Sequence, residues 1–199
     1  MFYKIARGVC IIVLHLLFRV KVEGKEHIPC KKGYILVANH RTNFDPLFVV
    51  AGLRQQVHFM AKAELFRGWF MEHLMNALGA FPVDRGKGDS SAIDWSDNLI
   101  RQGRVLGMFP EGTRSPDGKP QRPKSGAALI AMRTQADVLP CAVCFGEKLT
   151  FRAPVTVRYG APIAFEQLGF TPGINSPREI KNASHQMMGE VIRLLEVGV

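Results

Sequence analysis

The chain has 199 residues, of which 47% are hydrophobic and 22% charged, so it can bury one sizeable core. This composition excludes a disordered tail, a coiled coil and a disulfide-stapled miniprotein. Lys and Arg number 26 against 17 Asp and Glu, and the resulting formal charge of +9 predicts a negatively charged partner. Nucleic acid, an anionic membrane and a phosphorylated substrate all fit this charge.

The first apolar segment covers residues 8–18, is interrupted only by His15, and has cations on both sides. A helix of that length rises about 16 Å, roughly half the thickness of the bilayer hydrocarbon, so we do not expect it to cross. Residues 19–22 supply no small-residue cleavage site, which argues against a secretory signal. We expect residues 1–19 to form a helix lying in a membrane interface, the alternative being a helix packed on the protein's own core. The flanking cations are Lys4, Arg7, Arg19 and Lys21.

Beyond residue 20, short apolar runs alternate with helical patterns, which predicts a single α/β domain over residues 20–199. The predicted strands are Tyr34–Ala38, Val57–Ala61, Ala80–Val83, Val105–Phe109, Val138–Phe145 and Val155–Tyr159. The predicted helices are Pro46–Leu53, Leu65–Leu78, Ser91–Gln102, Gly126–Thr134 and Pro177–Glu196.

Directly after the predicted strand 34–38, residues 39–46 read NHRTNFDP. His40 then lies at the carboxyl end of a strand, where open α/β sheets place their sites, and Asp45 is predicted to cap the next helix. If the chain turns between them, the Asp45 carboxylate fixes the imidazole tautomer and leaves the other ring nitrogen free to accept a proton. The nucleophile would then be a substrate hydroxyl. The alternative is that Asp45 is only a cap and His40 a structural histidine.

Residues 79–85, GAFPVDR, form a second block in which a strand end carries a charged pair. Arg85 can bind an anion while Asp84 orients it. The alternative is a surface ion pair.

Residues 109–115, FPEGTRS, form a third block and open the long irregular segment Pro110–Ser125. Arg114 is suited to bidentate phosphate binding, and Gly112 permits close approach of the backbone. The alternative is a solvated basic loop. Further donors are Thr113, Ser115, Arg122, Lys124 and the N-terminus of the predicted helix from Gly126.

Cys141 and Cys144 form a CxxC inside the apolar run 138–145. A zinc site would need further ligands nearby, and a redox pair would follow a strand at a helix start, so we predict two buried strand cysteines. Four cysteines spread over the chain favour a reducing compartment. The sequence also lacks GxxxxGK[ST], GxSxG and HExxH, so its chemistry must use other groups.

Four ordered blocks resemble the glycerolipid acyltransferase family typified by 1-acyl-sn-glycerol-3-phosphate acyltransferase, over roughly residues 34–163. The resemblance implies an α/β fold with a mixed, mostly parallel central sheet flanked by helices, plus an N-terminal membrane-interface helix. The matching blocks are NHxxxxD at 39–45, KxEL at 62–65 leading to GxxxVDR at 79–85, FPEGTRS at 109–115 and VxPxAV at 138–143.

By that resemblance His40 is the general base that takes the proton of the acceptor's sn-2 hydroxyl, and Asp45 orients it. The hydroxyl attacks an acyl thioester and expels the thiol of coenzyme A or acyl carrier protein, with no metal and no bound cofactor. Arg114 would hold the acceptor phosphate, joined by Arg85 and Lys124. The substrate-binding residues that the family implies are Arg85, Glu111, Gly112, Thr113, Arg114 and Lys124.

The resemblance therefore implies a monotopic enzyme on the cytoplasmic face of the membrane that makes phosphatidic acid. Its partners would be a lysophospholipid acceptor, acyl-CoA or acyl carrier protein, and an anionic membrane surface. Alternative acceptors are glycerol 3-phosphate, another lysophospholipid and a lyso-aminolipid. A non-catalytic basic lipid-binding module is a further alternative. Nucleic acid is disfavoured, because the chain has two Trp, three Tyr and no recognisable nucleic-acid module.

One predicted helix, Leu65–Leu78, is unusually bulky and rich in methionine. It either lines an acyl pocket or enters lipid, or it is an ordinary amphipathic core helix. Its large apolar residues include Phe66, Trp69, Phe70, Met71, Leu74 and Met75.

Overall fold

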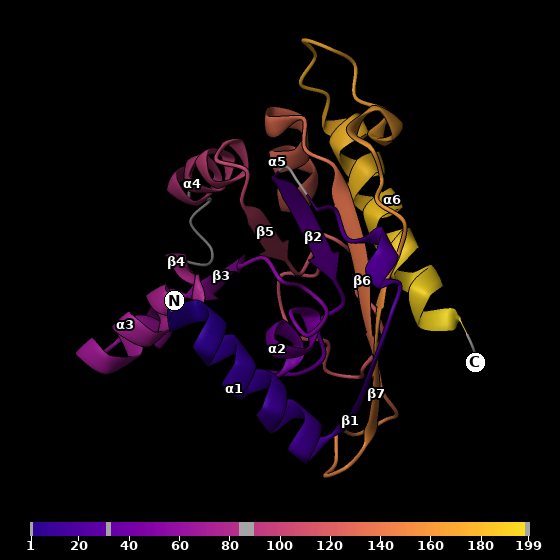
Figure 1. The fold of residues 1–199 in the computed structure, drawn as a ribbon. Coiled ribbons are helices and arrows are strands. Elements are labelled where there is room, and N and C mark those ends of the chain that lie inside the picture. The colour runs from indigo at the N-terminus through magenta and orange to yellow at the C-terminus, as the bar shows by residue number, and fades with distance from the viewer. Residues whose placement is uncertain (1, 31–32, 84–89, 198–199) are drawn as a thin grey trace.

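The structure, a computed structural model, describes residues 2–30, 33–83 and 90–197. They form a seven-stranded sheet in the order β1-β7-β6-β2-β5-β3-β4, with helices on both faces (Figure 1). The strands are β1 (Arg19–Glu23), β2 (Tyr34–Ala38), β3 (Val57–Lys62), β4 (Phe81–Val83), β5 (Val105–Met108), β6 (Val138–Cys144) and β7 (Pro154–Tyr159). The helices are α1 (Phe2–Leu17), α2 (Asp45–Val49), α3 (Trp69–Leu78), α4 (Ser90–Arg101), α5 (Gly126–Thr134) and α6 (Pro177–Glu196).

Neighbouring strands of the sheet run parallel, except for the antiparallel pair β6–β7. The expected mixed, mostly parallel sheet is therefore confirmed. Since β2, β5, β3 and β4 all point the same way, their carboxyl ends meet at one edge. The segments that follow β2 and β5 are consequently neighbours, and each contains one of the motif blocks of the sequence.

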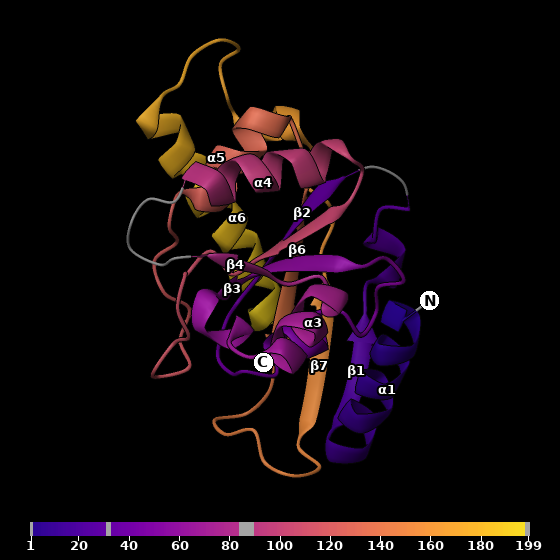
Figure 2. The same cartoon turned by 90° about the vertical axis from the view of Figure 1, so that its left-hand side faces the viewer.

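The central strand β2 is buried on both faces, as its uninterrupted apolar sequence predicts. Tyr34 and Leu36 pack in one core cluster with α1 and α2, while Ile35 and Val37 pack in a second cluster with α4, α5 and α6. Figure 2 shows α4 and α5 on the opposite side of β3 and β4 from α3. This two-sided burial makes β2 a rigid support for the residues that follow it.

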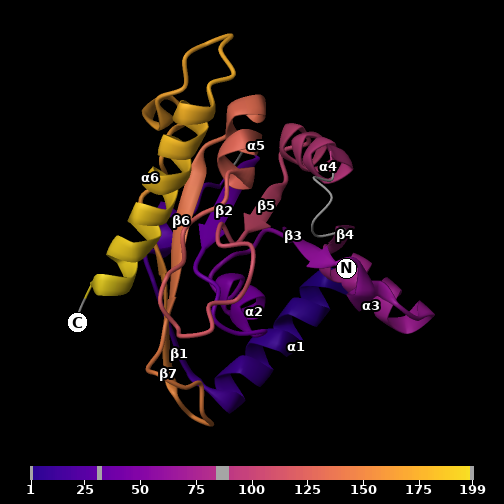
Figure 3. The same cartoon turned by 180° about the vertical axis from the view of Figure 1, so that it is seen from behind.

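Helix α1 runs along the edge of the molecule and ends beside β1 (Figures 1 and 3). Leu14 and, directly after the helix, Phe18 are buried in the core, so one side of α1 packs on the protein. The opposite side exposes five apolar residues. Within the described residues, no helix combines the length and apolarity needed to span a membrane. The exposed residues are Ile5, Val9, Ile12, Val13 and Leu16.

Three parts of the predicted secondary structure differ from the structure. The predicted helix Pro46–Leu53 is shorter, because α2 ends at Val49. Strand β1 was not predicted, although its sequence RVKVE alternates as a half-buried edge strand does. The predicted continuous helix Leu65–Leu78 is wrong: Gly68, with φ of 89°, separates a short 3-10 turn, Ala63–Phe66, from α3. A residue with positive φ cannot continue a right-handed helix.

The CxxC cysteines both lie on β6, as predicted, and both are free thiols. Cys141 is buried and Cys144 half-buried. Burial raises the pKa of both thiols, which keeps them protonated and unreactive.

Candidate active site

His40 and Asp45 meet across a tight turn at the carboxyl end of β2. His40 Nδ1 lies 2.8 Å from Asp45 Oδ2, and the Asp45 side chain is fully buried. The predicted N-cap role of Asp45 is wrong, because Asp45 is the first residue of α2 and the N-cap is Phe44. The carboxylate points back into the turn, where it forms a hydrogen bond with the imidazole.

The Asp45 carboxylate is surrounded by donors from its own turn. The backbone N–H groups of Arg41 and Thr42 donate to Oδ2 at 2.5 and 2.7 Å, and the Thr42 hydroxyl donates to Oδ1 at 2.8 Å. Such donors stabilise a buried negative charge and allow the carboxylate only one orientation. The turn is thus built around a carboxylate that holds the imidazole.

The loop after β5 holds the other side of His40. The imidazole ring stacks on Phe109, with ring centroids 4.1 Å apart and planes 17° apart. The backbone N–H of His40 donates to Glu111 Oε1 at 2.7 Å, and the Ser115 N–H donates to the His40 carbonyl at 2.8 Å. The His40 side chain keeps 14% of its surface exposed, so the ring remains accessible from one direction.

Glu111, predicted to bind substrate, is buried, and its carboxylate binds the backbone of His40 and of Gln121. Its Oε1 accepts from the N–H of His40 and its Oε2 from the N–H of Gln121 at 2.9 Å. Burial raises the pKa of Glu111, while the two N–H groups oppose that shift. Both oxygens therefore accept hydrogen bonds from main-chain donors, which ties the loop after β5 to the turn after β2.

A pocket of about 470 Å³ lies beside His40 and is lined by residues from several strands. One part of its lining is apolar and comes from β3, β4 and β5. The other part, which contains the polar side chains of Thr113 and Lys124, comes from the loop after β5 and the start of α5. The lining residues are His40, Met60, Val83, Gly107, Met108, Phe109, Pro110, Gly112, Thr113, Lys124, Gly126 and Ala127.

The predicted substrate-binding residues are distributed unevenly around this pocket. Gly112, Thr113 and Lys124 line it, whereas Arg114 is exposed and lies one residue beyond the lining. Gly112 has φ of +75°, and a Cβ built there would come within 2.9 Å of the Lys124 side chain. Gly112 thus lets the Lys124 side chain pass close to the backbone.

The predicted pair of Asp84 and Arg85 lies outside the described residues, which end at Val83 and resume at residue 90. Among the residues that the structure describes, no group of three or more His, Cys, Asp or Glu is placed to hold a metal ion.

Sequence reasoning missed the apolar lining and the stacking partner of the histidine. Met60, Val83 and Met108 lie at or near the carboxyl ends of β3, β4 and β5. The rule that parallel strands end at one edge could have identified them from the predicted strands alone. Phe109 belongs to the third motif block, but no local pattern indicates that its ring lies on an imidazole that follows another strand.

Comparisons with known proteins identify the family of the chain. The Acyltransferase family model matches residues 19–144. The 1-acyl-sn-glycerol-3-phosphate acyltransferase of Bacillus subtilis is 29% identical over 198 residues, covering 98% of each chain. That of Streptococcus pneumoniae is 34% identical over 167 residues, which are 79% of this chain and 57% of the relative.

Among solved structures, the crystal structure of the 1-acyl-sn-glycerophosphate (LPA) acyltransferase PlsC from Thermotoga maritima superimposes with a TM-score of 0.74. It is 25% identical in sequence, and the match covers 98% of this chain and 78% of that one. The fold, the ordered motif blocks and the family match point to the same conclusion. The chain belongs to the Acyltransferase family.

Proposed function

We propose that this acyltransferase transfers an acyl chain from a thioester to the sn-2 hydroxyl of 1-acyl-sn-glycerol-3-phosphate, which gives phosphatidic acid. The observation that carries the proposal is the His40–Asp45 pair, which opens on a pocket with an apolar part and the cation Lys124. The relatives named above, which carry that activity in their names, support the choice of acceptor.

His40 acts as the general base. With a proton on Nδ1 donated to Asp45, Nε2 carries a lone pair and accepts the proton of the acceptor hydroxyl. The hydroxyl oxygen forms a bond to the thioester carbon, and a tetrahedral oxyanion results. When the oxyanion collapses, the C–S bond breaks and the imidazolium returns its proton to the departing thiolate. Asp45 stabilises the imidazolium while it exists.

The acceptor phosphate binds at the polar part of the pocket. A phosphomonoester carries nearly two negative charges at neutral pH and needs several donors. Lys124, Thr113 and the N-terminus of α5 at Gly126 meet there, and the dipole of α5 favours an anion at that end. Arg114 and Arg85, the arginines of the motif blocks, supply further donors to the phosphate. The fixed phosphate positions the hydroxyl against His40.

The acyl chain lies against the apolar part of the pocket, on Met60, Val83 and Met108. Methionine side chains are flexible and accommodate an aliphatic chain without polar cost. The donor is acyl-CoA or acyl carrier protein, and the chemistry above requires no bound cofactor.

The substrate also accounts for the organisation of the chain. Residues 1–19 attach the enzyme to the membrane that contains the lysophospholipid, and residues 20–199 form the acyltransferase domain. The five exposed apolar residues of α1 support this attachment. The enzyme works on the cytoplasmic face, where both candidate donors occur.

The test is an assay of thiol release with one acyl-CoA and a panel of acceptors. We expect 1-acyl-sn-glycerol-3-phosphate to exceed glycerol 3-phosphate, lysophosphatidylethanolamine and a phosphate-free monoacylglycerol. Preference for glycerol 3-phosphate would show that the proposed acceptor is wrong and would leave the proposed mechanism unaffected. Preference for the phosphate-free acceptor would refute the phosphate site. Vesicle binding without turnover on any acceptor would favour a non-catalytic lipid-binding module.

A further inference from the structure

The loop between β6 and β7, residues 145–153, is fastened to the end of α1. The Arg152 N–H donates to the Leu17 carbonyl at 2.6 Å, and the Arg152 guanidinium donates to the His15 carbonyl at 3.1 Å. In return Arg19 Nε donates to the Arg152 carbonyl at 2.9 Å. Figures 1 and 3 show this β6–β7 loop at one end of the molecule, beside the end of α1. The loop and the helix end are therefore a single structural unit.

The β6–β7 loop presents a large aromatic ring to solvent. Phe151 is 76% exposed, although Leu149 in the same loop packs against the core. Leu16, on the last turn of α1, is 64% exposed. Since the loop binds the backbone on both sides of Leu16, the exposed ring belongs to a segment that is fixed beside the last exposed apolar residue of α1.

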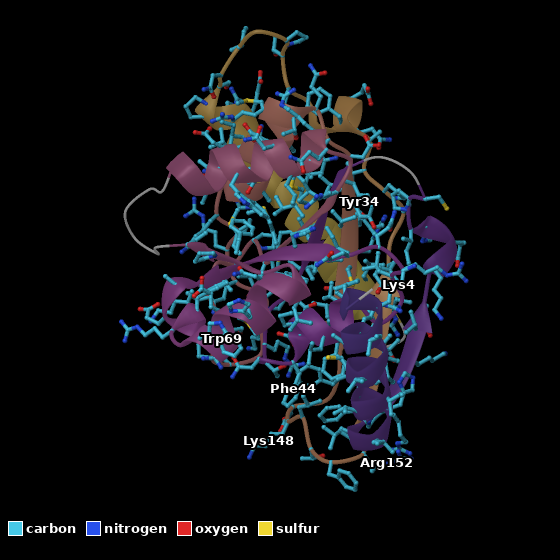
Figure 4. The ribbon with its side chains drawn as sticks, turned by 60° about the vertical axis from the view of Figure 1, so that its left-hand side comes forward. Lys4, Tyr34, Phe44, Trp69, Lys148 and Arg152 are labelled. Carbon is cyan, nitrogen blue, oxygen red and sulfur yellow. The ribbon has the colours of Figure 1, made fainter. Side chains whose placement is uncertain are left out.

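The surroundings of Phe151 are cationic. Lys148 and Arg152 flank it in the sequence, and Arg19 is hydrogen-bonded to the loop, while Glu147 is the one acidic residue of the loop. Figure 4 shows Lys148 and Arg152 at one end of the molecule, with Lys4 further along α1. An aromatic ring with cations beside it matches the boundary between anionic headgroups and acyl chains.

We propose that the β6–β7 loop is a second membrane-contacting element, in which Phe151 enters the bilayer boundary and Lys148 and Arg152 bind anionic headgroups. The inference rests on the proposed function, because a lipid acceptor requires the enzyme at the bilayer. A helix lying in the interface can still roll about its own axis. A contact beyond the helix end prevents that rolling and gives the domain one orientation.

The same loop is tied to the catalytic turn, which makes this orientation relevant to catalysis. The Arg41 guanidinium donates to the carbonyls of Phe145 and Gly146 at 2.8 and 3.0 Å and lies 4.0 Å from the centroid of the Phe145 ring. The backbone N–H of the same Arg41 donates to Asp45. Docking of the β6–β7 loop therefore sets how the His40–Asp45 pair faces the bilayer.

The test compares Phe151→Ser with Ile174→Ser in sedimentation with vesicles of phosphatidylcholine and phosphatidylglycerol, mixed about two to one. Ile174 is a matched control, because it is apolar, 55% exposed and lies in the loop before α6, at the opposite end of the molecule (Figure 1). We expect Phe151→Ser to lower the partition coefficient about tenfold and Ile174→Ser to leave it unchanged. Equal partitioning of the two variants would overturn the proposal.

A charge variant examines the headgroup contact separately. Lys148→Glu should weaken binding to the anionic vesicles about fivefold and leave binding to pure phosphatidylcholine unchanged, since only anionic lipid attracts the cation. Lys181→Glu on α6 is the control with the same change of net charge. If both charge variants lost vesicle binding equally, the loss would be a long-range effect of net charge, and the proposed contact of Lys148 with headgroups would be refuted.

Two further measurements separate this inference from the proposed function. On a short-chain, water-soluble acceptor and thioester, Phe151→Ser should retain wild-type turnover, and only turnover on vesicle-bound acceptor should fall. Absence of acyl transfer in the wild type would refute the proposed function and leave the vesicle result standing. A concentration-dependent dimer in lipid-free buffer that Phe151→Ser abolishes would assign the loop to a second copy and overturn the inference.

Discussion

The turn after β2 and the loop after β5 lie at the same edge of the sheet, but their polar groups are used differently. In the turn after β2, the Asp45 carboxylate is buried and bound by groups of the protein itself. In the loop after β5, Thr113, Arg114 and Lys124 are exposed. Under the proposed mechanism, the group that moves a proton is thus held before substrate arrives, while the groups that bind the phosphate are left for the ligand to order.

Glu111 connects these two regions. It belongs to the loop after β5 by sequence, yet it is buried like Asp45 and donors from both regions bind it. Variants in the turn should therefore reduce turnover, variants in the exposed groups should weaken acceptor binding, and Glu111 should behave like the turn.

His40→Ala should reduce kcat about 10³-fold, because it removes the only group placed to accept the acceptor proton in the proposed mechanism. The measurement is thiol release at saturating acceptor, with circular dichroism to check the fold. His185→Ala, an exposed position on α6, provides the control. A folded His40→Ala enzyme with wild-type turnover would refute the mechanism.

Asp45→Asn should reduce kcat about 10²-fold and leave the KM of the acceptor nearly unchanged. In the wild type the carboxylate accepts hydrogen bonds from the N–H groups of Arg41 and Thr42 and from the His40 ring. The NH₂ group of asparagine is itself a donor and would face at least one of these donors. Steady-state kinetics and thermal unfolding should be measured together. Reduced stability with full activity would limit Asp45 to a structural role in the turn.

Glu111→Gln should lower kcat about tenfold and destabilise the protein by about 1–3 kcal/mol. The new NH₂ would face the N–H of either His40 or Gln121 and leave that buried donor unpaired. Glu166→Gln, at an exposed carboxylate, is the matched control. If Glu111→Gln instead raised the acceptor KM alone, Glu111 would belong with the exposed substrate-binding groups.

Arg114→Ala should raise the KM of the phosphorylated acceptor about tenfold and leave the donor KM unchanged, since one charge-assisted contact is lost. Arg114→Lys should lie between the wild type and Arg114→Ala, because lysine keeps the charge without the bidentate geometry. Arg178→Ala on α6 controls for net charge. A fall in kcat at an unchanged acceptor KM would place Arg114 in the chemical step.

Several elements could be predicted from the sequence because their signals are local. Strand β2 and helices α5 and α6 have the predicted bounds, since each has a run or period of apolar residues with clear ends. The meeting of His40 and Asp45 was also foreseeable, because a single turn of the chain separates them.

The other features depend on partners that are distant in sequence. Strand β1 exists because its backbone pairs with β7 near the other end of the chain. The stacking of Phe109 on His40 and the Glu111 bridge join loops that follow two different strands. No window of sequence contains both members of such a pair.

By itself, the sequence determined the family and the candidate site residues, because residue type and spacing reflect what a proton transfer and a phosphate require. The tertiary structure alone decided how these residues are used. It removed the predicted cap role of Asp45, kept its predicted contact with His40, and made Glu111 a link between two loops. It also placed Phe151 beyond the end of α1. Burial and hydrogen-bond partners depend on segments that only the folded sheet brings together.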